Sequence, residues 1–298
     1  CGIVGWTDFT KDLSNETDIL KAMADRVAQR GPDASGYWLS REAALGHRRL
    51  VVVDPEGGKQ PMIRKAGGDT YALVYNGELY NTEDIRRELV LKGYSFEGWS
   101  DTEVLLTSYI EWGEACLQRL NGIYAFAIWD EKRKQLFLAR DRIGVKPLFY
   151  CQKGSSFLFG SEIKALLAHP MISPRITREG LAEIFALGPA RTPGIGVFSG
   201  ISELKPGYWM KVDRNGLAIR QYWALNSHSH EDDFEHTAAR VRELVYDSIE
   251  RQLVSDVPLC ALLSGGLDSS AITAVASEVY KRDGKESIRT FSIDYVGN

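Results

Sequence analysis

The apolar residues of the segment Cys1-Gly2-Ile3-Val4-Gly5 predict a buried strand with a cysteine at its start. If an initiator Met is removed ahead of it, Cys1 carries a thiol and a free α-amine. Such an amine has a pKa of about 8 and can take the thiol proton directly or through a water. The segment thus predicts a nucleophile and its base on one residue. The alternative is an accidental chain boundary at a cysteine.

Short strand patterns bounded by turn residues continue outward from this segment through the first half of the chain. They cover 2–6, 35–39, 43–47, 48–54, 71–80, 122–130, 134–142, 146–152 and 156–162, and helical patterns interrupt them at 14–29, 81–91, 101–120 and 162–169. Segments such as 126–140 have the form of hairpins closed by a charged turn. We therefore predict an α+β domain of largely antiparallel sheets with helices on their outer faces.

The pattern changes after residue 176. Thr177 precedes an apolar helical stretch as a capping residue, and a hairpin with the turn Asn215-Gly216 is expected over 203–223. The polar stretch 226–233 predicts an exposed linker. Its histidines, His228 and His230, form a weak candidate for a metal pair, because no partner lies at ligand spacing.

A parallel crossover unit is predicted beyond the linker, with a helix at 234–255, a strand at 257–263, a helix at 269–284 and a strand at 288–295. We predict two domains, 1–218 and 219–298, the second being the start of an α/β parallel sheet. Because one or two strands do not complete such a sheet, we expect a longer natural protein.

Composition limits the class of partner. The 298 residues are 44% hydrophobic and 26% charged with a net charge of −4, and Lys and Arg are scattered. This charge pattern argues against a nucleic-acid groove and against binding to an anionic membrane surface. No apolar run approaches the roughly 20 residues of a membrane span and no targeting pattern is evident, so we expect a cytoplasmic protein. Cys116, Cys151 and Cys260 lie in apolar settings and are expected to be buried and inert.

A glycine-rich loop, Ser264 to Ser270, lies between a predicted strand and a predicted helix. Its glycines let backbone N–H groups approach a phosphate, the serines add donors, and the helix N-terminus favours an anion. The loop lacks the Gly-Lys-Ser/Thr ending of the Walker motif. It resembles the pyrophosphate loop of the ATP pyrophosphatases. A capped glycine turn without a ligand is the alternative.

Four further clusters accompany Cys1, namely Arg30-Gly31-Pro32-Asp33, Gly46 to Leu50, Tyr75 to Asn81 and Ser100 to Glu103. With the first five residues they resemble the glutaminase domain of class II glutamine amidotransferases. With the loop at 264–270, the chain resembles the bacterial glutamine-hydrolysing asparagine synthetases. The resemblance implies an N-terminal-nucleophile sandwich, αββα with two antiparallel sheets, followed by the start of an α/β parallel-sheet ATP-pyrophosphatase domain.

The resemblance also implies roles for residues in the first domain. Cys1 is the nucleophile, and the Asn76 side chain and the Gly77 backbone N–H supply the two donors that a tetrahedral oxyanion needs. A carboxylate clamp and an ammonium partner fit Arg49 and Asp101. The implied glutamine pocket comprises Arg49, Leu50, Val51, Val52, Val53, Asn76, Gly77, Glu78 and Asp101. Taken alone, Asn76-Gly77 fits a hairpin turn, Arg49 a surface ion pair and Asp101 a helix N-cap.

In the second domain the resemblance implies ATP and pyrophosphate contacts at Leu262, Ser264, Gly265, Gly266, Leu267, Asp268, Ser269, Ser270 and Ile293. Asp268 is the expected ligand of Mg²⁺, which takes a carboxylate together with phosphate oxygens. No organic prosthetic group is expected.

The implied reaction hydrolyses glutamine at Cys1 and uses the ammonia to convert an aspartyl adenylate, formed from aspartate and ATP, to asparagine. Ammonia would be protonated in water, so a sheltered apolar passage is expected. Glutamine, aspartate and ATP are the expected partners, and a homodimer stays open. One alternative is a related amidotransferase with another carboxylate acceptor. Another is a non-catalytic module that binds glutamine or nucleotide.

Overall fold

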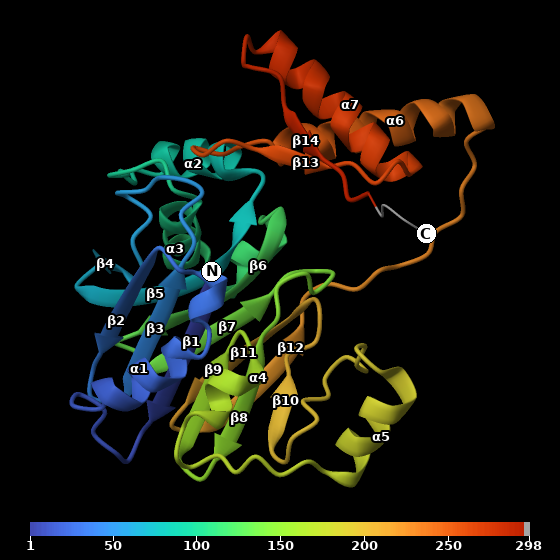
Figure 1. Cartoon of the computed structure of the whole chain (residues 1–298). Helices are drawn as coiled ribbons and strands as arrows, with labels where there is room; N and C mark the ends of the chain where they lie inside the picture. Colours follow the sequence, from blue (N-terminus) through green and yellow to red (C-terminus); the bar gives the residue numbers. More distant parts are fainter. Residues whose placement is uncertain (295–298) are drawn as a thin grey trace. The chain divides into compact units, whose positions relative to one another are not determined.

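The computed structural model describes residues 1–294 and divides the chain into two compact units, Cys1–Leu225 and Asn226–Asn298 (Figure 1). The domain boundary predicted after residue 218 falls inside strand β12 (Gly216–Gln221). This strand pairs along its whole length with β11 (Tyr208–Asp213), so the hairpin stays in the first unit. The turn between them is Arg214-Asn215, one residue earlier than predicted.

Two six-stranded sheets build the first unit, and every pairing within them is antiparallel, as predicted. One sheet has the order β10 (Ile201–Glu203), β8 (Phe149–Lys153), β9 (Ser156–Gly160), β1 (Gly2–Asp8), β3 (Ala43–Arg49), β2 (Ala34–Leu39). The other has the order β12, β11, β7 (Gln135–Arg140), β6 (Gly122–Asp130), β5 (Asp69–Leu79), β4 (Met62–Ala66).

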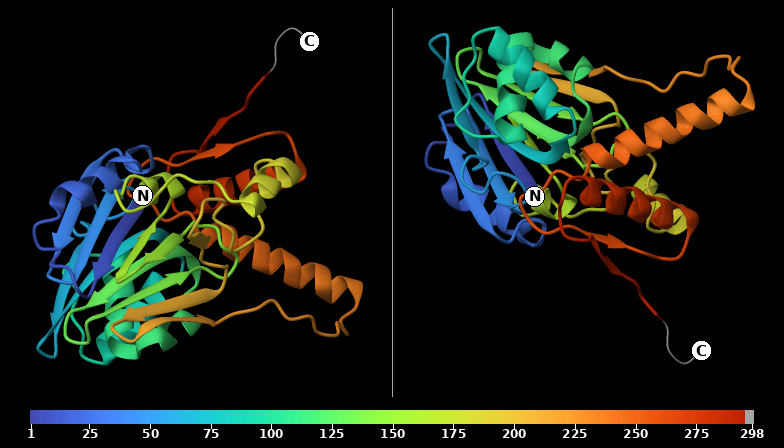
Figure 2. Two further views of the ribbon diagram at one scale, coloured as in Figure 1. Left: turned by 90° about the horizontal axis from the view of Figure 1, so that it is seen from below. Right: turned by 90° about the horizontal axis from the view of Figure 1, so that it is seen from above.

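Helices cover the outer faces, which confirms the αββα sandwich. Helices α1 (Thr17–Asp25) and α4 (Ile163–Leu167) pack on the first sheet, and α2 (Thr82–Leu91) and α3 (Asp101–Trp112) pack on the second. Figure 2 shows the two sheets face to face with these helices outside them. The short helix α5 (Arg178–Leu187) begins at Thr177, whose hydroxyl accepts the Gly180 N–H as predicted.

The three layers of core follow from the alternation of side chains along each strand. In β1, Ile3 packs between the sheets, whereas Val4 and Trp6 pack against the helical layer. In β6, Ala127 lies between the sheets and Phe126 points toward α3. A strand buried on both faces has the near-continuous apolar sequence that the first five residues display.

Several predicted elements end earlier than expected. The strand expected over 48–54 ends at Arg49, and the next residues form a loop in which Asp54 has a φ of 47°. The helix expected over 101–120 ends at Trp112, because Gly113 adopts a φ of 57°, and the chain continues as a 3₁₀ turn over Gly113–Gln118. Helices α1 and α4 are shorter than their predicted spans of 14–29 and 162–169.

The second unit contains α6 (Phe234–Arg251), β13 (Cys260–Leu262), α7 (Leu267–Arg282) and β14 (Arg289–Phe291). Strands β13 and β14 are parallel, which confirms the crossover. The last residue of the strand predicted over 288–295 lies outside the described residues. Cys260 is exposed, so the prediction that it is buried was wrong: its neighbour Ala261 is the β13 residue that is buried. Within residues 1–294, no helix has the length and apolar character that crossing a membrane requires.

Candidate active site

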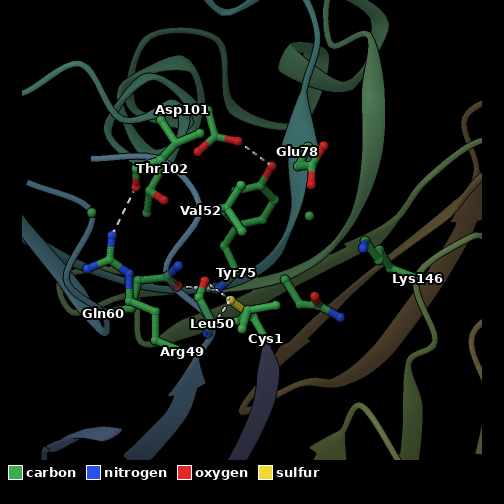
Figure 3. A pocket seen from close by; sticks show the side chains of 14 residues that line it. Cys1, Arg49, Leu50, Val52, Gln60, Tyr75, Glu78, Asp101, Thr102 and Lys146 are labelled. Atoms are coloured by element: carbon green, nitrogen blue, oxygen red, sulfur yellow. Dashed lines mark hydrogen bonds between the residues drawn. The ribbon is translucent and has the colours of Figure 1, made fainter. Parts of the chain in front are cut away.

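A pocket of about 600 Å³, including its open mouth, lies in the first unit and gathers residues from well-separated parts of the chain (Figure 3). Its lining is Cys1, Arg49, Leu50, Val52, Val53, Gly58, Gln60, Tyr75, Asn76, Gly77, Glu78, Asp101, Thr102 and Lys146. Of the residues expected to bind glutamine, all but Val51 are in this lining. The Val51 N–H instead donates to the Asp33 carboxylate over 2.8 Å.

Cys1 lies immediately before β1 and lines the pocket. Its Sγ lies 3.4 Å from the backbone N and 3.6 Å from the carbonyl O of Leu50. Its carbonyl accepts a hydrogen bond of 3.0 Å from Arg30 Nε, and Arg30 pairs with Glu162. Figure 3 shows the sulfur facing Leu50. Leu50 thus contacts the thiol of Cys1, and Arg30 holds its backbone.

The α-amine of Cys1 has an unusual electrostatic setting. Burial, and then the positive charges of Arg30 and Lys146, lower its pKa from 8.0 to about 6, against the opposing effects of Glu78 and Asp33. An amine with this pKa is mostly unprotonated at neutral pH. It can therefore accept a proton there without prior deprotonation by another group.

Asn76 and Gly77 lie within β5, where they pair with Ala125 and Tyr124 of β6, so the hairpin turn considered for them does not occur. The Asn76 side chain is buried, and its Nδ2 has no hydrogen-bond partner within residues 1–294. Such a donor is costly to leave unpaired and normally has a partner. At Gly77, an added Cβ would lie 2.3 Å from the Ile123 carbonyl O. No side chain fits at that position.

His47 of β3 supports this part of β5 and has no counterpart among the predicted site residues. Burial, and then the charges of the N-terminus and Arg49, lower its pKa to about 3 despite the hydrogen bond to Tyr75, so the ring is neutral. Its Nε2–H donates to the carbonyl O of Tyr75 over 2.9 Å. His47 stands in the cluster 46–50, which could have identified it, as well as in the strand pattern 43–47.

Arg49 is buried rather than engaged in a surface ion pair. Its guanidinium donates to the carbonyl O atoms of Val53, Asp54 and Pro55 at 3.1, 2.6 and 2.7 Å. These bonds replace the strand pairing expected for 50–54 and explain why the segment is a loop. Of the five N–H donors of a guanidinium, three are used here, and the others remain for a ligand.

Asp101 begins α3 but does not cap it. Ser100 is the N-cap, because its Oγ accepts the Thr102 N–H over 3.0 Å. The Asp101 carboxylate instead accepts the Tyr75 hydroxyl over 2.9 Å and the Leu79 N–H over 3.1 Å. Burial raises its pKa, against these hydrogen bonds. An acidic side chain is therefore present in the pocket that Arg49 also lines.

Five lining residues were not predicted, namely Gly58, Gln60, Tyr75, Thr102 and Lys146. Gln60 Oε1 accepts the Tyr75 N–H over 2.6 Å, the Tyr75 hydroxyl contacts Asp101, and Lys146 acts on the Cys1 amine. Tyr75 stands in the cluster 75–81, which could have identified it. Gln60 and Lys146 carry no motif of their own, because only the folded chain brings them to the pocket.

The loop at 264–270 belongs to the second unit. Gly265 has a φ of 82°, which favours glycine, and Gly266 begins α7 with no side-chain cap on its N-terminus within the part of the chain described. The hydroxyls of Ser264 and Ser269 lie 3.0 Å apart. The first-turn N–H groups of α7 are thus available to an anion.

The other residues predicted to contact ATP lie around this loop. Leu267, Asp268, Ser269 and Ser270 form the first turn of α7. Leu262 ends β13 and Ile293 follows β14, and both side chains are exposed. Among residues 1–294, no three His, Cys, Asp or Glu side chains lie close enough together to hold a metal ion. His228 and His230 are therefore not part of such a group. Asp268 is a lone carboxylate, the donor that Mg²⁺ combines with phosphate oxygens.

Comparison with known proteins gives matches for both units. Residues 1–223 match the glutamine amidotransferase domain, and residues 240–298 match asparagine synthase. Asparagine synthetase [glutamine-hydrolyzing] 3 of Bacillus subtilis is 57% identical over the whole chain, which covers 48% of that protein. Amidase chry2 of Gibberella zeae is 32% identical over 92% of the chain, which covers 41% of that protein. The chain spans about half the length of the curated relatives it matches.

A solved structure, that of an allosteric regulatory enzyme of purine biosynthesis, shares the fold. The match has a TM-score of 0.54 at 18% sequence identity and covers all of this chain and 67% of the other. At this identity the likeness concerns the fold alone.

Proposed function

The chain belongs to the family that joins a glutamine amidotransferase domain to an asparagine synthase domain, and we propose that it supplies the glutamine-hydrolysing part of asparagine synthesis. Cys1 would release ammonia from glutamine, and the second domain of the whole protein would use it on an adenylate of aspartate. The observation that carries the proposal is the buried, unpartnered Asn76 Nδ2 in the same pocket as the Cys1 thiol.

The first chemical step forms a bond between Cys1 Sγ and the amide carbon of glutamine. The α-amine takes the thiol proton as the sulfur attacks, and the carbonyl oxygen becomes an oxyanion. Asn76 Nδ2 and the Gly77 N–H would donate to it. When the carbon–nitrogen bond breaks, the protonated amine returns its proton to the leaving group, which departs as ammonia. Water then cleaves the thioester to give glutamate, with the amine again as base.

Two groups would distinguish glutamine from other amides. The unused N–H groups of Arg49 would bind the α-carboxylate, and the Asp101 carboxylate would bind the α-ammonium. Asp101 also meets a hydroxyl and a backbone N–H, which hold its orientation while the ligand binds. A substrate lacking either charged group would leave one buried partner unpaired, and such losses reduce binding strongly.

In the second domain, we propose that the loop 264–270 holds the pyrophosphate of ATP at the uncapped N-terminus of α7. Asp268 would hold Mg²⁺, and this ion would neutralise phosphate charge. ATP, aspartate and glutamine are the proposed substrates. A cytoplasmic location belongs to the same proposal, because a reducing compartment keeps Cys1 as a free thiol.

The experiment compares glutamate release by the parent chain, by Cys1→Ala, and by a variant with one Gly placed before Cys1. Mass spectrometry first establishes that the parent begins at Cys1. The added Gly keeps the thiol but converts the α-amine to an amide that cannot act as a base. We expect both variants to lose at least about 10³-fold in kcat. If either hydrolyses glutamine at the parent rate, the proposed role of Cys1 is wrong.

A second candidate function differs from the first only in the carboxylate that receives the ammonia. It is favoured by the relative named an amidase, which shows that proteins similar to this chain are not all named asparagine synthetases. The test measures glutamine-dependent AMP formation by the natural full-length protein with aspartate and with other carboxylates. Aspartate should give the highest rate if the main proposal holds.

A further inference from the structure

Asp54 is a buried carboxylate that no step of the proposed reaction uses; only 1% of the residue is exposed. Its Oδ1 accepts the Gly57 N–H over 2.7 Å, and its Oδ2 accepts the N–H groups of Trp99 and Ser100 over 2.9 and 3.0 Å. The first bond lies within the loop 50–58, and the other two reach the segment directly before Asp101. One side chain therefore connects two separate walls of the pocket.

The same residue is also part of the Arg49 wall. Its carbonyl O accepts Arg49 Nη2 over 2.6 Å and the Gly58 N–H over 2.9 Å. Its backbone has a φ of 47°, a conformation that non-glycine residues rarely adopt. Asp54 thus contacts the Arg49 guanidinium through its backbone and the start of α3 through its side chain.

Two glycines leave room for this carboxylate. A Cβ at Gly57 or at Gly98 would lie 2.3 Å from Asp54 Oδ2. Both the loop and the segment before α3 therefore approach the carboxylate more closely than any other residue type allows at these positions. The close fit shows that the two segments are shaped around Asp54.

A second buried carboxylate holds the same segment from the side of α3. Glu103 accepts the Glu97 N–H over 3.0 Å and the Gly98 N–H over 3.1 Å, and it pairs with Arg64. Together, Asp54 and Glu103 accept four successive N–H groups, those of residues 97 to 100. Glu103 connects this segment only to α3 and β4, whereas Asp54 connects it to the loop that Arg49 holds.

We propose that Asp54 is a positioning residue that fixes the separation between Arg49 and Asp101, and with it the selectivity for an amide that carries both an α-carboxylate and an α-ammonium. The inference rests on the proposed function, in which these two residues bind glutamine. Asp54 touches neither the substrate nor the reacting atoms. It acts by keeping the two binding groups at the spacing of one amino acid.

The test is Asp54→Asn, which keeps the shape of the side chain but turns one acceptor into an NH₂ donor. In either orientation of the amide, that donor faces a backbone N–H, so the loop and the segment 97–100 separate. We expect kcat/KM for L-glutamine to fall roughly tenfold or more, mainly through KM. For glutaramate, which lacks the α-ammonium, the fall should be at least about threefold smaller, because this substrate does not use Asp101.

Two matched controls separate this effect from charge and from folding. Glu56→Gln removes the same charge from an exposed position of the same loop, where Glu56 pairs only with Lys59 among the described residues. Asp8→Asn removes a buried carboxylate that accepts the Thr10 and Lys11 N–H groups at the other end of β1. Both controls should keep the parent ratio of glutamine to glutaramate activity. Asp54→Asn should lower that ratio at a temperature where all variants are folded by circular dichroism.

An unchanged ratio in Asp54→Asn, or an equal fall for both substrates, would overturn the inference. Failure of the proposed function has a different signature, namely a parent chain that does not hydrolyse glutamine. In that event the inference is tested by measuring the affinity for L-glutamine by calorimetry. Asp54→Asn must still bind L-glutamine roughly tenfold more weakly than Glu56→Gln does. A parent that neither hydrolyses nor binds glutamine would overturn both.

Discussion

The Asn76 side chain favours the proposed reaction more than it favours the stability of the fold. Its buried Nδ2 lacks a partner within residues 1–294, and an unpaired buried donor costs about 1–3 kcal/mol. The same donor is worth most when charge develops on a nearby oxygen, because it needs no reorganisation at that moment. In the proposed reaction, Asn76 would therefore exchange stability of the folded state for stabilisation of the oxyanion.

Replacing Asn76 with Ala should lower kcat for glutamine hydrolysis by about 10²–10³-fold. The melting temperature should hardly fall, since no hydrogen bond of Nδ2 is lost. Asn81→Ala is the matched control, because Asn81 donates to the Arg119 carbonyl O and accepts the Asn121 N–H. That variant should lose stability and keep its activity. Equal kcat values for Asn76→Ala and the parent would contradict the role.

The rate of hydrolysis should rise with pH through about 6, because the Cys1 α-amine acts as a base only after losing its proton and its pKa is lowered to about 6. Lys146 contributes to that lowering, since a positive neighbour disfavours the protonated amine. Lys146→Met should therefore move the rising limb of kcat/KM to higher pH. Lys59→Met, at an exposed position, should leave it in place. A limb that does not move in Lys146→Met would refute the electrostatic account.

At the scale of elements, β5 connects the two halves of the site. Its Tyr75 contacts Asp101 on α3, His47 on β3 and Gln60 from the preceding loop. The next two residues supply the proposed oxyanion donors. Because β6 pairs with β5 through both of these positions, the donors are held by a strand rather than by a turn.

Gly77→Ala tests how closely β5 and β6 must approach. The new Cβ would meet the Ile123 carbonyl O at 2.3 Å, so the strands must separate at the oxyanion site. We expect a loss of about 1–3 kcal/mol in the free energy of unfolding, measured with urea, and a large fall in kcat. Gly67→Ala, which has open space but a φ of 59°, should lose only about 1 kcal/mol and keep its kcat. Normal kcat in Gly77→Ala would show that the site tolerates the separation.

At the scale of the whole molecule, the three hydrophobic clusters of the sandwich all lie between Ile3 and Tyr222. The pocket is also built entirely from the first unit. The linker 226–233 has no regular secondary structure. Among the described residues, every side chain that lines this pocket therefore belongs to the first unit.

A chain ended after Leu225 should fold and hydrolyse glutamine with the kcat and KM of the parent. The physical reason is that burial of its own core supplies its stability. Circular dichroism and a glutamate-release assay provide the measurement. Ending the chain after residue 218 instead should be destabilising, because it cuts β12 from its pairing with β11. Loss of activity in the longer piece would show that the units depend on each other.

The antiparallel sheets, the parallel crossover and the family could all be predicted from the sequence, because periodicity and ordered motifs are local properties of the chain. The sequence could not predict that residues 50–54 leave the strand, that Ser100 caps α3 in place of Asp101, or that Gln60 and Lys146 reach the pocket. Arg49 turns back to bind three carbonyls of the next loop, a side-chain contact that the strand pattern does not show. Asp54 holds the segment before α3 across 46 positions of the sequence. Only tertiary structure brings such groups together, because buried donors and acceptors must be paired wherever the chain places them.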